Sequence, residues 1–190
     1  MSAMPKTKLT VQEYLERDRS AEVKSEYFDS AMREVERKTP AHNFISVNLM
    51  GEIRTRLKGG PFSLFASTMR MQIEATDRFA YPDPIIYRLP FQASEMDRDT
   101  LANPTALIEI TSDNTFSFDH SAKLRHYMKI PTFMEYILVS QDEAACDRYI
   151  RQADGSWALL SFVGLDAELV FTSVPARIPL AEIYAGVTFE

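Results

Sequence analysis

Residues 103–113 read NPTALIEITSD. A turn-forming Asn-Pro pair precedes the apolar run and a Ser-Asp pair follows it, which predicts a short strand buried on both faces. Glu109 lies inside this run. An ionised carboxylate without a partner in such surroundings costs more free energy than a strand of this size recovers. We therefore expect Glu109 to be neutralised, paired with a cationic side chain or bound to a metal ion.

The composition is that of one globular domain spanning residues 1–190, because 45% hydrophobic content is ample for a continuous core at this length. A formal charge of −6 argues against a protein that coats DNA non-specifically. It leaves room for an enzyme that makes few phosphate contacts and whose acidic residues hold a metal. The chain shows no internal repeat.

No apolar run approaches the roughly 18 residues of a membrane span, and the first ten residues lack the apolar centre of a signal peptide. Cys146 is the single cysteine, which excludes an internal disulfide and a cysteine-based zinc site. We expect a cytoplasmic protein without membrane contact.

The first half of the chain contains two predicted helices. Thr10 and Glu13 form a capping-box pair at the start of a short helix over residues 10–18. Residues 24–37 predict a strand or hairpin. Residues 41–58 predict an amphipathic helix, because apolar side chains recur at steps of four: Ile45, Leu49, Ile53 and Leu57. Three apolar runs that follow predict successive strands of one sheet: 62–67, 70–75 and 80–89.

The second half predicts a strand, a helix and a strand in succession. Asp119 is a candidate N-cap and Pro131 a stop for a helix of about three turns, and residues 135–139 follow as a buried strand. This order predicts a right-handed crossover between parallel strands. Residues 146–162 predict a hairpin that turns at 153–155, followed by a strand near 168–171 and one helical turn within 178–187.

Asp83 is the second carboxylate in an apolar segment, 26 residues before Glu109. Two strands and the polar loop between them would bring the two acids side by side. Adjacent buried carboxylates repel, so one of them takes up a proton unless a cation lies between them. Mg²⁺ is the simplest such cation, because it accepts one or two carboxylates together with water and a substrate phosphate.

Lys123 is the third member of this candidate site. On a helical wheel of 100° per residue, Tyr127 lies about 40° from Lys123, which places the lysine at the border of the inward, apolar arc. Arg125 and Lys129 fall on the opposite side. An inward lysine just after the strand of Glu109 could pair with that acid, orient an attacking water or stabilise charge on a phosphate.

The segments YPDPIIY (81–87), NPTALIEITSD, FDHSAKLRHYMKIPTFMEYILV (118–139) and IPLAEIYAGV (178–187) resemble the Uma-type "putative restriction endonuclease" family of the PD-(D/E)XK nuclease superfamily. TVQEYLE, SEYFD and the run over 41–67 follow the same order, so the resemblance covers nearly the whole chain. It implies a metal-dependent phosphodiesterase core, and it also implies a homodimer.

Residue by residue, the resemblance implies that Asp83 is the aspartate of the "PD" element and Glu109 the acid of the next strand. Lys123 matches the lysine that this family carries on the helix, since position 111 is Thr. The carbonyl of Ile110 would complete the metal shell. Glu26, in SEYFD, matches an acidic residue near the site.

Several positions depart from the family pattern. Pro84 stands where a valine commonly follows the "PD" aspartate, and its missing backbone donor suits an edge or a bulge. The segment TSDNT replaces the usual LSPST, and Ser30 replaces a glycine. These departures leave Asp83, Glu109 and Lys123 in place.

Structural alternatives remain for each residue. Glu109 could form a purely structural ion pair, Asp83 could be a turn residue, and Lys123 or Glu26 could be solvated. The three histidines do not form a metal set by spacing, although His120 lies on the inner arc and could contact phosphate.

We therefore expect an α/β, restriction-endonuclease-like domain with a mixed central sheet flanked by helices. The expected function is hydrolysis of DNA phosphodiester bonds that depends on Mg²⁺, with Mn²⁺ as an alternative. Two other functions stay open: an inactive nucleic-acid-binding or assembly module, and a hydrolase of another phosphorylated substrate.

Overall fold

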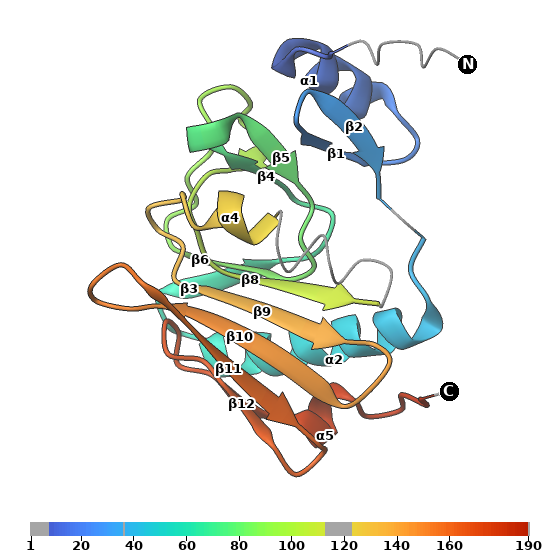
Figure 1. The fold of residues 1–190 in the computed structure, drawn as a ribbon, viewed down its shortest axis with the longest axis vertical. Helices are drawn as coiled ribbons and strands as arrows, with labels where there is room; N and C mark the ends of the chain where they lie inside the picture. Colours follow the sequence, from blue (N-terminus) through green and yellow to red (C-terminus); the bar gives the residue numbers. More distant parts are fainter. Residues whose placement is uncertain (1–7, 36, 113–122, 190) are drawn as a thin grey trace.

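The computed structural model describes residues 8–35, 37–112 and 123–189. Four α-helices and thirteen β-strands are described, and Figure 1 shows how they are arranged. Their bounds are α1 Val11–Ser20, β1 Ser25–Phe28, β2 Ala31–Glu34, α2 Pro40–Leu57, β3 Phe62–Phe65, β4 Arg70–Ile73, β5 Arg78–Ala80, β6 Ile85–Arg88, β7 Thr100–Leu101, β8 Pro104–Thr111, α4 Leu124–Tyr127, β9 Glu135–Ser140, β10 Ala145–Arg151, β11 Trp157–Val163, β12 Glu168–Val170, β13 Arg177–Pro179 and α5 Leu180–Ile183.

The larger sheet has six strands in the order β11-β10-β9-β8-β6-β3. β8 and β9 run parallel, with Ala106 opposite Glu135, and the other neighbours are antiparallel. The sheet is therefore mixed. The parallel pairing on either side of α4 confirms the predicted strand-helix-strand unit.

A second sheet of five strands, ordered β2-β1-β5-β4-β7, lies beside α1. The sequence predicted one sheet, but the strand predicted over 70–75 is β4, Arg70–Ile73, and belongs to this second sheet. The apolar run 80–89 divides between both sheets, because β5 ends at Ala80 and β6 begins at Ile85. Pro82 and Pro84 each lack a backbone donor, so the chain leaves one sheet there before it enters the other. Asp83 lies in this bend and not in a strand.

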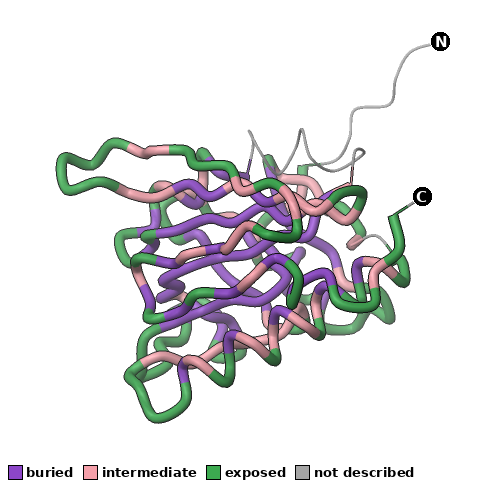
Figure 2. The backbone as a smooth tube through the Cα atoms, turned by 90° about the horizontal axis from the view of Figure 1, so that it is seen from below, coloured by how far each residue is buried: buried purple, intermediate pink, exposed green. Residues whose placement is uncertain are grey.

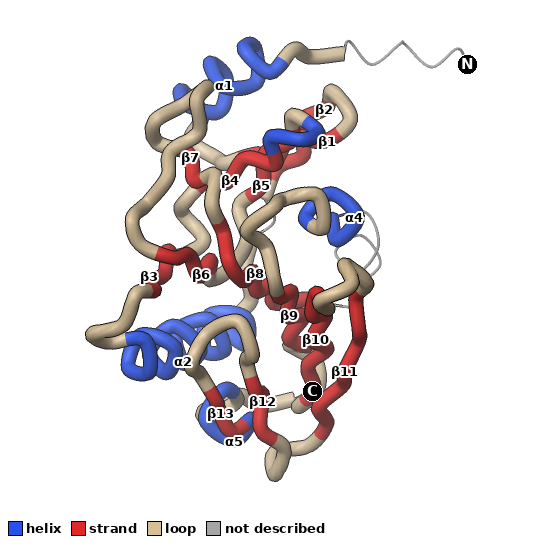
Figure 3. Tube along the Cα trace, turned by 90° about the vertical axis from the view of Figure 1, so that its left-hand side faces the viewer, coloured by secondary structure: helices blue, strands red, loops and turns tan. Residues whose placement is uncertain are grey.

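Helices cover both faces of the six-stranded sheet (Figures 1 and 3). α2 packs its predicted apolar stripe on one face, in a core shared with Ile108, Ile110 and α5. On the other face, α4 lies between the two sheets, in a core that joins Leu124 and Tyr127 to side chains of β4, β8 and β9. Figure 2 shows the buried segments concentrated in the central strands.

The predicted start of α1 and end of α2 are observed, whereas α1 continues to Ser20 and α4 ends at Tyr127, before the predicted stop at Pro131. α1 begins with the capping box of Thr10 and Glu13, and α2 ends just before Gly59, which has a positive φ of 78°. The helix predicted to start near Asp119 is described only from Lys123 onward, so its N-cap lies outside the described residues. β12 pairs with β13 in a hairpin of its own. None of the described helices is long and apolar enough to cross a membrane.

Candidate active site

Glu109 lies in the middle of β8, every residue of which is buried, and only 5% of Glu109 is exposed. Its Oε1 atom accepts a hydrogen bond from the Lys123 ammonium at 3.1 Å and another from the Tyr127 hydroxyl at 3.1 Å. Both donors come from the α4 segment that covers this face of the sheet. The buried glutamate therefore has the cationic partner that its position in the strand requires.

Lys123 also contacts Glu26, with 3.0 Å between Nζ and Oε1. Glu26 belongs to β1 in the five-stranded sheet, whereas Glu109 belongs to the six-stranded sheet. All three side chains are buried. One ammonium group thus joins carboxylates from the two sheets, at the place where the sheets meet through α4.

A polar network fixes Glu26 from the side of the five-stranded sheet. The backbone amide of Tyr81 donates to Glu26 Oε1 at 3.3 Å, and the Tyr81 hydroxyl donates to Asp18 at 2.5 Å. Arg70 then joins Asp18, at 2.6 Å, to Asp97. Burial raises the pKa of the Tyr81 hydroxyl, which keeps it a donor at neutral pH.

Asp83 is the most deeply buried acid of the site, with 1% of its surface exposed. Its Oδ2 atom accepts a hydrogen bond from the Ile110 amide at 3.0 Å and lies 3.0 Å from His42 Nε2. The Lys38 ammonium lies 3.6 Å from the same oxygen. Burial raises the pKa of Asp83, but His42, Lys38 and the Ile110 amide outweigh it, so the net pKa is lowered and the carboxyl group stays ionised.

The strand register brings Asp83 to Glu109. In the antiparallel pair β6–β8, Ile85 lies opposite Leu107, and the Ile108 amide bonds to the Pro84 carbonyl at 3.1 Å. Beyond this bond the strand pairing ends, and the Ile110 amide bonds to the Asp83 side chain instead. The Asp83 carboxylate therefore bonds to the peptide group that joins Glu109 to Ile110.

The backbone carbonyl of Ile110 faces the same edge of β8. Backbone groups of successive residues in a strand point to opposite neighbouring strands, and those of every second residue point to the same one. Thr111 directs its carbonyl to Gln141 beyond β9, at 3.0 Å, whereas Ile108 directs its amide to the side of β6. Ile110 therefore presents both its amide and its carbonyl on the side of Asp83.

These donors fit a hard divalent cation. Asp83 Oδ1 is buried and has no hydrogen-bond partner among the residues that the structure describes. A buried oxygen normally has a partner, and a bound cation would provide one here. Within the same residues, no group of three or more His, Cys, Asp or Glu side chains could hold a metal ion. Mg²⁺ does not need such a group, because it keeps several waters and takes one or two carboxylates together with substrate oxygens.

The charges of the site agree with this fit. Three carboxylates, those of Glu26, Asp83 and Glu109, face two ammonium groups, those of Lys38 and Lys123. With every group ionised, the site carries one net negative charge. A divalent cation would reverse this to one positive charge, which a single phosphodiester would neutralise.

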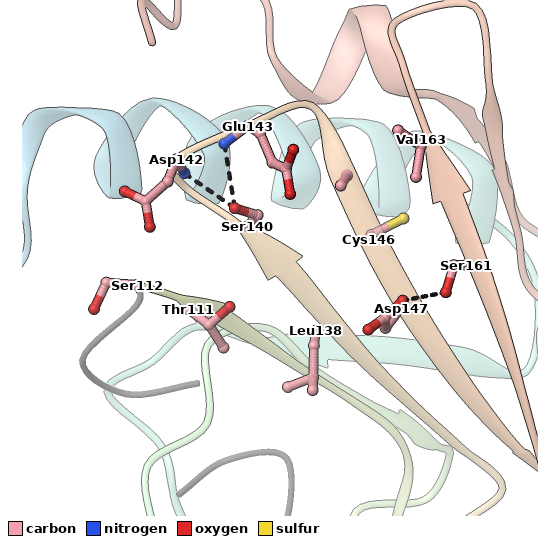
Figure 4. Close-up of a pocket in the computed structure, with 11 residues that line it drawn as sticks. Thr111, Ser112, Leu138, Ser140, Asp142, Glu143, Cys146, Asp147, Ser161 and Val163 are labelled. Atoms are coloured by element: carbon pink, nitrogen blue, oxygen red, sulfur yellow. Dashed lines mark hydrogen bonds between the residues drawn. The ribbon is translucent and has the colours of Figure 1, made fainter. Parts of the chain in front are cut away.

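A cavity of about 340 Å³ lies beside Thr111, which is two residues after Glu109 in β8. Leu138, opposite Glu109 in the β8–β9 register, lines it together with Thr111 and Ser140 (Figure 4). Three acids, Asp142, Glu143 and Asp147, also line it. The hydroxyl groups and these acids suit the neutral parts of a substrate better than a second phosphate.

Of the five residues that the sequence singled out, the structure places Glu26 and Glu109 against Lys123, and Asp83 against the backbone amide of Ile110, which follows Glu109. Arg125 and Lys129 are exposed and Tyr127 is buried, as the helical wheel predicted. His120 lies outside the described residues.

The sequence did not indicate His42, Lys38 or Tyr81 as members of the site. His42 carries a detectable signal, because it continues the buried stripe of α2 three residues before Ile45. Lys38 and Tyr81 carry none, since their contacts depend on the bend around Asp83.

Comparisons with known proteins agree with this architecture. Residues 11–180 match the model of the Uma2 family, described as "Putative restriction endonuclease". Two Synechocystis sp. proteins, sll1609 and slr1290, are 27% and 28% identical to this chain. The matches cover 86% of this chain and 93% of sll1609, and 97% of this chain and 96% of slr1290.

A solved structure with a similar fold comes from Anabaena variabilis and is described as a putative nuclease belonging to DUF820. Its TM-score is 0.78 at 18% sequence identity, over 95% of this chain and 99% of that chain. At this identity the match shows a shared fold, which is restriction-endonuclease-like.

Proposed function

Because the chain belongs to the Uma2 family of putative restriction endonucleases, we propose that it is a metal-dependent endonuclease that hydrolyses DNA phosphodiester bonds. The observation that carries this proposal is the bond between the Asp83 carboxylate and the peptide group of Glu109 and Ile110, next to a buried lysine. Two acids and an ammonium group at one point of a sheet are the parts that hydrolysis of a phosphodiester requires.

Asp83, Glu109 and the Ile110 carbonyl would hold the ion, which is Mg²⁺ or, alternatively, Mn²⁺. When bound, such an ion would neutralise charge on a phosphate and lower the pKa of a water molecule bound to it, so that this water could act as a nucleophile at neutral pH. Lowering of the Asp83 pKa supports this role, because an acid must be ionised to ligate a cation.

Lys123 would position the attacking water and stabilise the charge that develops on the phosphate oxygens. Glu26 and Glu109 hold its ammonium group from two sides, which restricts its motion. Tyr127 in turn fixes the carboxylate of Glu109. Glu26 is therefore a positioning residue, because its only described cationic contact is Lys123.

DNA is the proposed substrate, and the cavity beside Thr111 and Leu138 would receive the sugar and base next to the scissile phosphate. The Lys38 side chain is 35% exposed and lies 3.6 Å from Asp83 Oδ2, so its ammonium group would be available to a phosphate bound beside Asp83. A cytoplasmic location, where the thiol of Cys146 stays reduced, belongs to the same proposal.

A homodimer is also part of the proposal, and β11 is the surface that supports it. β11 ends the six-stranded sheet, and its seven residues carry no charge. Leu160 and Val163 are exposed, the latter to 70%. A long, uncharged and apolar edge strand is prone to pair with another strand, and an antiparallel second copy of β11 would place no like charges opposite each other.

A cleavage panel tests the function. Single-stranded, duplex and branched DNA, RNA and nucleotides would be incubated with the protein and Mg²⁺ or Mn²⁺, with EDTA as the control. Cleavage of DNA that requires the ion is the expected result. Binding of nucleic acid without cleavage or metal-binding heat would favour the inactive module, and turnover of nucleotides alone would favour the other hydrolase.

A further inference from the structure

The two oxygens of the Asp83 carboxylate have different surroundings. Oδ2 is in contact with the Ile110 amide, His42 Nε2 and the Lys38 ammonium, at 3.0, 3.0 and 3.6 Å. Oδ1 is equally buried and has no hydrogen-bond partner among the described residues. One oxygen is thus fully occupied by the protein, and the other one lacks a ligand.

His42 is the side chain that fixes this difference. It lies in the first turn of α2, where its amide bonds to the capping hydroxyl of Thr39 at 3.1 Å, and its ring is buried. An ionised carboxylate only accepts hydrogen bonds, so His42 Nε2 must donate. The Ile110 amide cannot move without the strand. Lys38 is more distant from Oδ2 and partly exposed, so the histidine is the rigid side-chain donor.

We propose that His42 is a positioning residue that makes the site selective for Mg²⁺ and Mn²⁺ over Ca²⁺. This inference rests on the proposed metal-dependent function. Because His42 occupies Oδ2, Asp83 offers the cation only Oδ1. Mg²⁺ requires a compact octahedral shell and accepts single carboxylate oxygens, whereas Ca²⁺ takes six to eight oxygens and often both oxygens of one carboxylate.

Loss of the His42 contact would change the chemistry of the site in a specific direction. Oδ2 would keep the Ile110 amide but lose its second rigid donor, so the carboxylate could rotate and offer both oxygens to an ion. Affinity for Ca²⁺ would then rise relative to affinity for Mg²⁺. A residue that only stabilised the fold would lower both affinities, or neither, and would leave their ratio unchanged.

Isothermal titration calorimetry of the full chain with Mg²⁺, Mn²⁺ and Ca²⁺ tests this inference. We expect His42→Ala to lower the ratio of Mg²⁺ affinity to Ca²⁺ affinity by about tenfold. We expect His42→Gln, whose amide can still donate to Oδ2, to restore most of it. Asn43→Ala is the matched control, because it changes the adjacent, exposed residue in the first turn of α2, whose side chain bonds the Thr39 carbonyl, and leaves His42 in place; its ratio should stay within about twofold of the unmodified protein.

An unchanged ratio in folded His42→Ala would overturn the role of His42 while leaving the proposed function intact. If the unmodified protein bound none of the three ions, the metal-dependent function would fail, and this inference with it. Should His42→Ala not fold, ¹⁵N NMR of the unmodified protein decides. The Nε2–H tautomer and its hydrogen bond should persist when Mg²⁺ is added, and their loss on addition would overturn the inference.

Discussion

Asp83 accepts a hydrogen bond from the backbone amide of Ile110, with 3.0 Å between the nitrogen and Oδ2. If the pairing of β6 with β8 continued past Pro84, the next main-chain carbonyl would accept the hydrogen bond of the Ile110 amide. The Asp83 carboxylate accepts it instead. The spacing between Asp83 and Glu109 is therefore set by the backbone of the sheet. Such a rigid arrangement is what a site for a small, geometrically demanding cation needs.

Glu109→Gln should abolish function without unfolding the protein. The amide keeps the shape of the side chain but lacks the charge that would ligate a cation. We therefore expect the cleavage rate to fall by at least about a hundredfold and the affinity for Mn²⁺ to fall as well. The measurements are single-turnover cleavage and calorimetry, with circular dichroism to verify the fold.

Glu135→Gln is the matched control for this variant. Glu135 is an equally buried glutamate on the adjacent strand, where it accepts hydrogen bonds from the amides and hydroxyls of Thr172 and Ser173. Its replacement should lower stability and leave the cleavage rate of the folded protein unchanged. Cleavage that survived in Glu109→Gln would remove this acid from the mechanism.

Lys123→Met should destabilise the fold as well as the site. The change leaves two buried carboxylates without their shared cation, and breaking a buried ion pair in this way costs about 3 kcal/mol or more. Urea unfolding measures this loss. Lys129→Met, on the exposed side of the same segment, should change the free energy of unfolding by less than about 0.5 kcal/mol. Equal stabilities of the two variants would contradict the buried pairing.

Much of the fold could be predicted from local sequence. The steps of four from Ile45 to Leu57 define α2, and the apolar run around Glu109 defines β8, because each pattern reports a buried face directly. The assignment of strands to two sheets could not be predicted. It depends on the bend between Pro82 and Pro84, where the chain passes from β5 to β6, and no periodicity encodes that passage.

The site was predictable to the extent that burial makes a charge conspicuous. Glu109 and Asp83 stand out because their neighbours are apolar, and Lys123 because a helical wheel turns it inward. The partners that complete the site were not predictable, since Tyr81 and Lys38 reach it through tertiary contacts between segments far apart in sequence.

The network of Asp97 and Arg70 predicts a stability change in acid. Burial raises the pKa of Asp97, but hydrogen bonds from the Asp99 amide, Thr100 and Arg70 outweigh it, so its folded pKa lies below the unfolded value of about 4. A lowered folded pKa stabilises the protein above the unfolded pKa, and this contribution is lost as the pH falls through the folded pKa.

The free energy of unfolding should therefore fall less steeply below about pH 4 in Asp97→Asn than in the unmodified protein. Denaturant titrations at a series of pH values measure both curves. Asp166→Asn, which changes an exposed carboxylate, serves as the control and should follow the unmodified protein. Parallel curves for all three proteins would exclude a stabilising role for the Asp97 charge.

The uncharged edge of β11 predicts an oligomeric state that charge can disrupt. Multi-angle light scattering should give twice the chain mass of 21.7 kDa for the unmodified protein and the single mass for Leu160→Lys. Leu89→Lys, at another exposed leucine away from β11, should remain dimeric. A monomer in all three cases would exclude the homodimer.

The central claim is that Asp83 and Glu109 share one divalent cation beside Lys123. Crystals soaked in Mn²⁺ test it most directly, because the ion gives an anomalous signal that locates it independently of the side chains. We predict a single peak about 2.1 Å from an oxygen of each carboxylate, with the Ile110 carbonyl in the same shell. A map with no peak between the two acids, or with the ion held by other side chains, would contradict the account.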